Sequence, residues 1–175
     1  MMTHDTLRKL NEMKLYGMAK GFEEQLASTM TGPLSFEERF GLLVDQEATW
    51  RENRRLQRLL QLAKLRENAC LEDVDFRPGR GLERSEMASL ALCNWIQHGH
   101  NLIITGPTGG GKTWLACALG NQACRRGLSV NFQRLPLLLE DLAVSHGDGS
   151  FRKRLLQLSK VDLLILDDFG MAALN

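Results

Sequence analysis

The sequence lacks several features that would assign it to a class of protein at once. No stretch approaches the 18 or so consecutive apolar residues of a membrane-spanning helix. The first residues lack the basic segment and apolar core of a secretory signal. The net charge is only +1, so overall charge points to no class of partner. These absences predict a cytosolic protein that has no membrane association.

Cysteine is also scarce and unpatterned. The four cysteines form no C-x-x-C pair and have no histidine at metal-binding spacing, which argues against a zinc site. Two of them lie seven residues apart on one predicted helix, where free cysteine usually behaves as a small buried hydrophobe. They are Cys70, Cys93, Cys117 and Cys124.

The first 72 residues are predicted to form a small all-helical domain. The first 30 show an apolar helical stripe, with a break expected at Gly17 and Gly21. A second helix opens at Ser35, where Glu38 completes a capping box. Its pattern runs without proline almost to residue 68, so we expect a kink or break near Trp50.

Four arginines of this second helix are spaced at i, i+3, i+4 and i+7, which places their guanidinium groups on one face. Stacked like charges repel, and arginine pairs well with phosphate, so duplex DNA is one candidate partner. A solvated face, partly paired with neighbouring glutamates, is the equal alternative. The arginines are Arg51, Arg54, Arg55 and Arg58.

A polar connector with proline and glycine, residues 73–81, is predicted to separate this domain from residues 82–175. After a helix over 83–98, strands alternate with helices, which predicts an α/β fold: a parallel sheet with helices on both faces. The strands are expected at Asn101–Thr105, Leu128–Gln133 and Val161–Leu166. The helices between them are expected at 112–126, 136–146 and 151–159.

The loop between the first strand and the next helix matches G-x-x-x-x-G-K-[ST], the P-loop pattern. Its glycines let backbone N–H groups converge on phosphate oxygens, and the helix N-terminus adds further donors. Lys112 is expected to reach the β- and γ-phosphates of ATP, and Thr113 to place its hydroxyl on Mg²⁺. A glycine-rich turn without a nucleotide is the alternative. The loop residues are Gly106, Pro107, Thr108, Gly109, Gly110 and Gly111.

The last predicted strand ends in two carboxylates, Asp167 and Asp168, which is the Walker B pattern. Asp167 is expected to hold Mg²⁺, and Asp168 to orient or deprotonate the water that attacks the γ-phosphate. The alternative is an Asp-Asp-Phe-Gly turn that closes a strand. An acid directly after the metal ligand favours an ATP hydrolase over a small-molecule kinase.

Longer stretches around these motifs resemble the IstB-type ATPases, AAA+ proteins encoded beside the transposase of certain bacterial insertion sequences. These ATPases are related to the DnaC-type helicase loaders of DNA replication. The resemblance lies in LCNWIQHGHNLIITG, GPTGGGKTWLACAL and LLILDDFG, and before them in LSFEERFGLL, RENRRLQRLLQLAKLR and LEDVDFRPGRGL. It therefore covers nearly the whole chain.

The resemblance implies ATP-dependent binding of double-stranded DNA, self-association, and cooperation with a transposase in choosing the target. It also implies the roles given above to Lys112, Thr113, Asp167 and Asp168. It favours DNA contact for the arginine face, and it suggests that the connector near Phe76 lies close to the adenine.

The resemblance also implies more sheet than this sequence contains. AAA+ sheets have the strand order 5-1-4-3-2, and members of the family continue past the Asp-Asp strand to a polar sensor and an arginine finger. This chain stops at Asn175. We therefore expect a truncated copy, whose ATPase half is marginally folded and inactive alone while residues 1 to about 69 stay helical.

Three functions remain open from the sequence. The first is an ATP-dependent transposition helper. The second is a helicase-loading adaptor in which ATP switches a contact between proteins. The third is an inactive remnant. The helical domain distinguishes the first two, because a helper should bind duplex DNA or transposase and a loader should bind a helicase.

Overall fold

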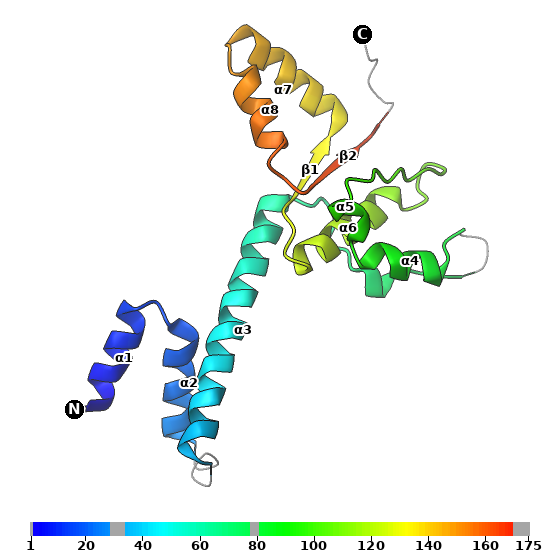
Figure 1. Ribbon diagram of the computed structural model, residues 1–175. Coiled ribbons are helices and arrows are strands. Elements are labelled where there is room, and N and C mark those ends of the chain that lie inside the picture. The colour runs from blue at the N-terminus through cyan, green and yellow to red at the C-terminus, as the bar shows by residue number, and fades with distance from the viewer. Residues whose placement is uncertain (1, 29–33, 78–80, 170–175) are drawn as a thin grey trace. The chain divides into compact units, whose positions relative to one another are not determined.

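The chain folds into two compact units (Figure 1). The computed structural model describes residues 2–28, 34–77 and 81–169. The units are Met1–Gln57 and Arg58–Asn175. The sequence predicts a later domain limit, at the connector 73–81. In the structure, residues 58–72 belong to the second compact unit.

The first unit contains two short helices, α1 (Met2–Glu12) and α2 (Tyr16–Ala27), and most of α3 (Phe36–Ala63). The helices α1 and α2 are separated at Lys14, whose φ of 60° lies in the left-handed region. The prediction of a helix break at Gly17 and Gly21 is therefore wrong. The residues after Ser28 up to Pro33, where the first helical stretch was expected to end, lie outside the described residues.

Gly17 and Gly21 instead lie inside α2, where both are buried. A Cβ added to Gly17 would meet the carbonyl oxygen of Gln46 at 2.6 Å and the Cα of Glu47 at 2.7 Å, both in α3. Gly17 therefore allows a close approach of two helix backbones, and Gly21 leaves room for the side chains of Leu43 and Gln46. Close packing of helices and the breaking of a helix both depend on the absence of a Cβ in glycine, so a single sequence does not distinguish the two.

Helix α3 begins as the sequence predicts. The Ser35 N–H donates to Glu38 Oε2 at 2.8 Å, and the Glu38 N–H donates to Ser35 Oγ at 3.2 Å, which confirms the capping box. The backbone and side-chain hydrogen bonds from Ser35 lower the pKa of the Glu38 carboxyl. The 28-residue helix runs without interruption through Trp50, so no break occurs there. No helix in the described part of the chain is long and apolar enough to cross a membrane.

The second unit opens with short helical pieces. The predicted helix over 83–98 is two helices, α4 (Arg84–Ala91) and α5 (Asn94–Gln97), because Cys93 between them adopts a left-handed φ of 61°. The remaining elements are η2 (Leu71–Asp73), α6 (Lys112–Arg125), β1 (Val130–Arg134), α7 (Leu135–Gly147), α8 (Phe151–Leu158) and β2 (Leu163–Asp167).

The sheet consists of β1 and β2, which pair in parallel with Val130 opposite Leu163 and Arg134 opposite Asp167. This confirms the second and third predicted strands and their parallel pairing. The segment Asn101–Thr105 forms no β-strand, and Ile103 is 82% exposed. The prediction of a buried strand at this segment is therefore wrong. An apolar run becomes a strand only when it has a backbone partner, and among the described residues this run has none.

Helix α6 covers the face of the sheet that carries Val130, Phe132 and Ile165, all buried. Gly120 of α6 faces this layer, and a Cβ there would meet Ile165 Cδ1 at 2.8 Å. Cys117 and Cys124 of α6 are fully buried, and burial raises the pKa of the Cys124 thiol to about 11. Both cysteines are therefore the buried hydrophobes that the sequence predicts.

Candidate functional site

The loop 106–111 leads directly into the first turn of α6. Its bend depends on Gly109 and Gly111, whose φ angles of 76° and 86° lie where a Cβ would be strained. The Gly110 N–H donates to the carbonyl of Pro107 at 3.1 Å and tightens the turn. The loop backbone thus curls immediately before a helix N-terminus, the arrangement in which N–H groups and the helix dipole bind phosphate.

Lys112, the first residue of α6, folds back over this loop. Its ammonium group donates to the carbonyl oxygens of Gly106 at 2.9 Å and Pro107 at 2.8 Å. An ammonium group held only by neutral carbonyls gains by pairing with an anion, since charge-assisted hydrogen bonds are roughly twice as strong. A phosphate in the loop would therefore compete well for this donor.

Thr113 and Asp167 meet at the end of β2. The Thr113 hydroxyl lies 3.0 Å from both carboxylate oxygens of Asp167, whose side chain is only 13% exposed. Mg²⁺ in nucleotide sites typically takes one or two protein oxygens, and phosphates and water complete the octahedron. This pair fits that donor set. Among the described residues, no group of three or more His, Cys, Asp and Glu could hold a metal ion.

Each aspartate at the end of β2 lies beside an arginine from elsewhere in the unit. Arg134 Nε donates to Asp168 Oδ2 at 2.8 Å, and Arg66 Nη1 lies 3.7 Å from Asp167 Oδ2. Arg134 ends β1, and Arg66 lies just after α3. Asp168 itself has a φ of 57°, uncommon for a residue with a side chain.

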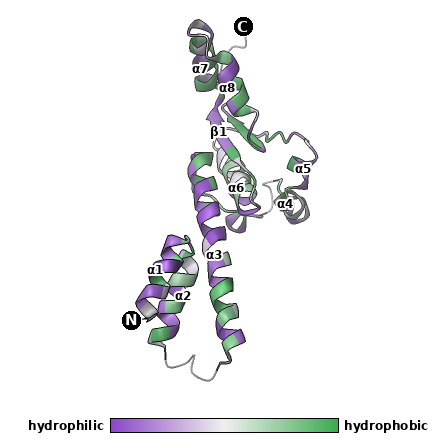
Figure 2. Ribbon diagram, turned by 60° about the vertical axis from the view of Figure 1, so that its left-hand side comes forward, coloured by the Kyte–Doolittle hydropathy of each residue, from purple (hydrophilic) through white to green (hydrophobic). Residues whose placement is uncertain are grey.

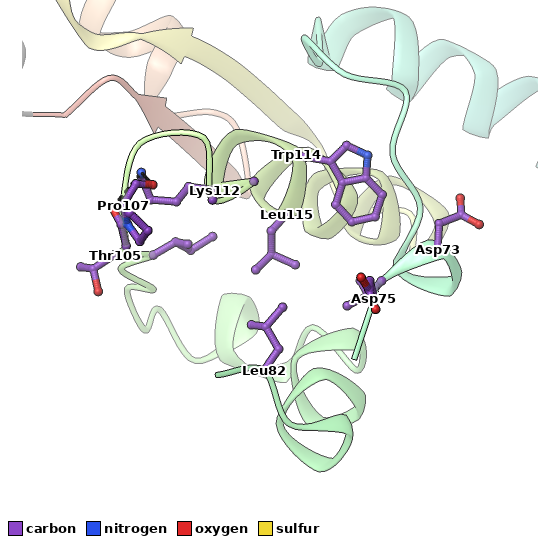
Figure 3. A pocket seen from close by; sticks show the side chains of 13 residues that line it. Asp73, Asp75, Leu82, Thr105, Pro107, Lys112, Trp114 and Leu115 are labelled. Atoms are coloured by element: carbon purple, nitrogen blue, oxygen red, sulfur yellow. Dashed lines mark hydrogen bonds between the residues drawn. The ribbon is translucent and has the colours of Figure 1, made fainter. Parts of the chain in front are cut away.

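A cavity of about 250 Å³ lies beside the loop 106–111 (Figure 3). Apolar side chains form much of its wall, and Figure 3 shows Leu82 and Leu115 pointing toward each other across it. Trp114 and Lys112 lie on opposite sides of Leu115 in this view. The cavity is lined by Asp73, Val74, Asp75, Leu82, Ile104, Thr105, Gly106, Pro107, Gly110, Gly111, Lys112, Trp114 and Leu115.

The connector contributes to this cavity through Asp73, Val74 and Asp75. Phe76, the connector residue singled out from the sequence, does not line it. Its ring packs against the buried cluster of Val74, Met87, Leu115 and Leu119. The guanidinium of Arg84 lies 4.5 Å from the centroid of this ring. The connector therefore lines the cavity beside the P-loop, but through residues that precede Phe76 by one to three positions.

Sequence reasoning missed Arg66, Arg134 and Trp114. A signal existed for Arg134: it follows a predicted strand directly, and the carboxyl ends of neighbouring parallel strands share one edge of the sheet. No such rule was available for Arg66, because its position depends on how the end of α3 packs. Trp114 follows Thr113, but only the direction of α6 turns its ring toward the cavity.

The four arginines of α3 have different surroundings. Arg51 donates through Nε to Glu47 at 2.6 Å, and this carboxylate also accepts the N–H groups of Gly17 and Met18. The Arg54 guanidinium lies 5.1 Å from the centroid of the Trp50 ring. The start of α3 carries hydrophobic colour, whereas the stretch further along is largely hydrophilic (Figure 2). Arg51 is thus part of the packing of α2 on α3.

Comparison with known proteins gives one family match over most of the chain. The model of the family described as IstB-like ATP binding protein matches residues 8–175. A protein of Pseudomonas fluorescens, named for ATP binding in the insertion sequence IS1162, is 55% identical over 176 residues, covering 100% of this chain and 76% of that protein. A Sinorhizobium fredii protein named for ATP binding in an insertion sequence is 48% identical, with coverage of 100% and 71%.

Proposed function

Since the chain belongs to the IstB-like ATP binding protein family, we propose that it binds ATP together with Mg²⁺ at residues 106–113 and Asp167. The observation that carries this proposal is the contact of Thr113 with Asp167 beside the P-loop. The two motifs are far apart in the chain, and their meeting supports a single metal–phosphate site.

The phosphates lie in the loop, held by backbone N–H groups and by Lys112 once it turns from the carbonyls of Gly106 and Pro107. Bound Mg²⁺ would neutralise phosphate charge and polarise the γ-phosphate. Thr113 and Asp167 would hold it. The base and ribose extend into the cavity, where Val74, Leu82 and Leu115 offer an apolar surface.

Asp168 acts in hydrolysis as the group that takes a proton from water. The water oxygen forms a bond to the γ-phosphorus, the bond from that phosphorus to the β–γ bridging oxygen breaks, and ADP leaves with the electron pair of that bond. The proton of the water passes to the Asp168 carboxylate and then to solvent. The position of Asp168, one residue beyond Asp167 at the end of β2, supports this role.

In the cell we propose that ATP controls assembly of this protein on double-stranded DNA as a helper in transposition, with a transposase as partner. The relatives named for insertion sequences support the setting. The parallel pair β1–β2, covered by α6, supports an AAA+ sheet for the family, and AAA+ proteins act through self-association. The arginine face of α3, without Arg51, is the proposed DNA contact.

Titration with a fluorescent ATP analogue tests the binding proposal. We expect the wild-type chain to bind the analogue with Mg²⁺, and the Lys112→Ala chain to lose binding because its loop then lacks the ammonium group. Lys153→Ala, a change on α8 away from the loop, is the matched control and should bind as wild type does. Equal affinity of the Lys112→Ala and wild-type chains would contradict the proposed site.

A further inference from the structure

Arg66 brings a positive charge to the carboxylate that is proposed to hold Mg²⁺. Its Nη1 lies 3.7 Å from Asp167 Oδ2. This distance exceeds the length of an N–H···O hydrogen bond, about 3.2 Å at most, so the two groups attract each other mainly through their charges. The Thr113 hydroxyl lies closer, 3.0 Å from both oxygens of this carboxylate. A cation from the segment after α3 therefore already lies beside the proposed metal ligand.

The backbone that carries Arg66 is held against α6. Leu65 lies so close to Gly120 of α6 that a Cβ on this glycine would be 2.9 Å from Leu65 Cδ2. Burial raises the pKa of the Cys117 thiol, also in α6, and hydrogen bonds from the backbone of Glu67 and Arg66 partly oppose this rise. These contacts attach the Arg66 backbone to the helix whose first turn carries the proposed phosphate site.

The Arg66 side chain is able to move although its backbone is packed. It is 52% exposed, whereas the side chain of Asp167 is 13% exposed. An arginine has a long flexible stem, so its guanidinium group can turn into water while the backbone stays in place. An ion pair with one half-exposed partner contributes little to stability, because water screens the attraction. The pair can therefore open at low cost, and Thr113 still contacts Asp167 when it does.

We propose that Arg66 is a positioning residue that takes the place of the metal ion beside Asp167, so that Mg²⁺ binds there in competition with the guanidinium group. Without a metal ion, the Asp167 carboxylate and the phosphates of ATP repel each other, and the nearby Arg66 charge reduces this repulsion. With a metal ion on Asp167, the same positive charge opposes metal binding, because like charges repel. This inference rests on the proposed metal site of Thr113 and Asp167.

Both effects of Arg66 reduce the benefit that ATP binding gains from Mg²⁺. The test measures this benefit in the full chain as the dissociation constant of the fluorescent ATP analogue in EDTA divided by that in Mg²⁺. Arg66→Gln removes the charge and keeps much of the side-chain volume, so this ratio should rise about two- to fivefold, the range expected from a half-exposed ion pair. Arg66→Lys keeps the charge and should give a ratio close to that of wild type.

Two further variants separate the charge of Arg66 from a general effect on the fold. Arg154→Gln removes the charge of another ion pair in the same unit, with Asp141 at 3.4 Å, and should leave the ratio unchanged. In an Asp167→Asn chain, Arg66→Gln should raise the ratio less, because the negative charge for which the two cations compete is gone. If Arg66→Gln loses its cooperative melt, Arg66→Met takes its place with the same expected rise.

A ratio that stays unchanged or falls in Arg66→Gln, while wild type binds ATP more tightly in Mg²⁺ than in EDTA, would overturn this inference and leave the proposed metal site standing. An equal rise in Arg66→Lys would also overturn it, because the charge would not be the cause. So would an equal rise in the Asp167→Asn chain. Equal wild-type affinity in Mg²⁺ and EDTA would overturn both this inference and the proposed metal site.

Discussion

The Thr113 hydroxyl lies 3.0 Å from both carboxylate oxygens of Asp167, although 54 residues separate them. One residue belongs to the first turn of α6 and the other ends β2, and the packing of α6 on the strand brings them together. The neighbouring Lys112 covers the loop through two carbonyl contacts. The residues proposed to bind phosphate and metal are thus gathered around a single helix N-terminus.

This contact predicts how ATP binding depends on magnesium. Thr113→Val keeps the shape of the side chain and removes the hydroxyl, so Mg²⁺ loses a ligand and Asp167 loses a donor. We expect ATP affinity with Mg²⁺ to fall about tenfold or more, in line with the loss of a hydrogen bond to a charged group. Titrations with Mg²⁺ and with EDTA measure the difference. Thr113→Ser, which keeps the hydroxyl, should keep the Mg²⁺ dependence of ATP binding. A Thr113→Val chain that kept the same Mg²⁺ dependence would contradict this prediction.

The glycines of the helical unit should respond to alanine in opposite directions. A Cβ at Gly17 would lie 2.6–2.8 Å from atoms of α3, so Gly17→Ala should destabilise the unit by about 1–3 kcal/mol. Gly41 in α3 has no atom within 4 Å of such a Cβ, so Gly41→Ala should stabilise it by about 0.5–1 kcal/mol through helix propensity. Urea unfolding followed by circular dichroism measures both, and a stabilising Gly17→Ala would show that the helices do not pack this closely.

Glu47 should make the stability of this unit depend on pH. Burial alone would raise its pKa, but hydrogen bonds from Arg51, Met18 and Gly17 outweigh burial and hold it below the ordinary value of 4.5. A lowered folded pKa means that the contribution is complete above 4.5 and is lost as pH falls through the folded value. Wild type should therefore lose stability as the solution is acidified below about pH 5.

Glu47→Gln should remove part of this acid dependence and cost about 1–3 kcal/mol at neutral pH, because its Arg51 partner and two backbone N–H groups lose a charged acceptor. Urea midpoints across an acid-to-neutral series give the comparison. Glu37→Gln, an exposed change in the same helix, is the control and should behave as wild type does. An identical acid profile for Glu47→Gln and wild type would rule Glu47 out as the cause.

The arginine face should give DNA binding a strong salt dependence without sequence preference. Each phosphate contact contributes about −0.9 to the log–log slope, so changing Arg54, Arg55 and Arg58 to alanine together should flatten the slope by up to about 3 units. Arg51 is left out because it bonds Glu47. Lys20→Ala on α2 is a single-charge control, and a slope that stays unchanged in the triple variant would mean that the face is solvated or binds protein.

Local chemistry made much of the protein predictable. The capping box at Ser35, the left-handed glycine after α6, the proline at the start of α7 and the parallel order of two strands all depend on neighbouring residues or on a pattern within one segment. The turn before α6 was predictable for the same reason, since its left-handed glycines lie within one short segment, whereas phosphate binding by this loop stays a prediction.

The errors arose where the answer depended on distant partners. Gly17 and Gly21 break no helix, because α3 lies close enough to need them. Asn101–Thr105 has the composition of a strand, yet it pairs with no other strand among the described residues. Cys93 splits a helix that periodicity predicts as continuous.

By itself, the sequence determined which residues are the candidates for binding phosphate and metal, because the loop, Lys112, Thr113 and Asp167 form motifs whose chemistry lies in consecutive residues. Only the tertiary structure decided what surrounds them. Arg66 and Arg134 reach the two aspartates, and Val74 and Leu82 reach the cavity, from segments far along the chain. Side chains brought together by packing leave no periodic trace in a single sequence, whereas residues that share one turn or one helix do.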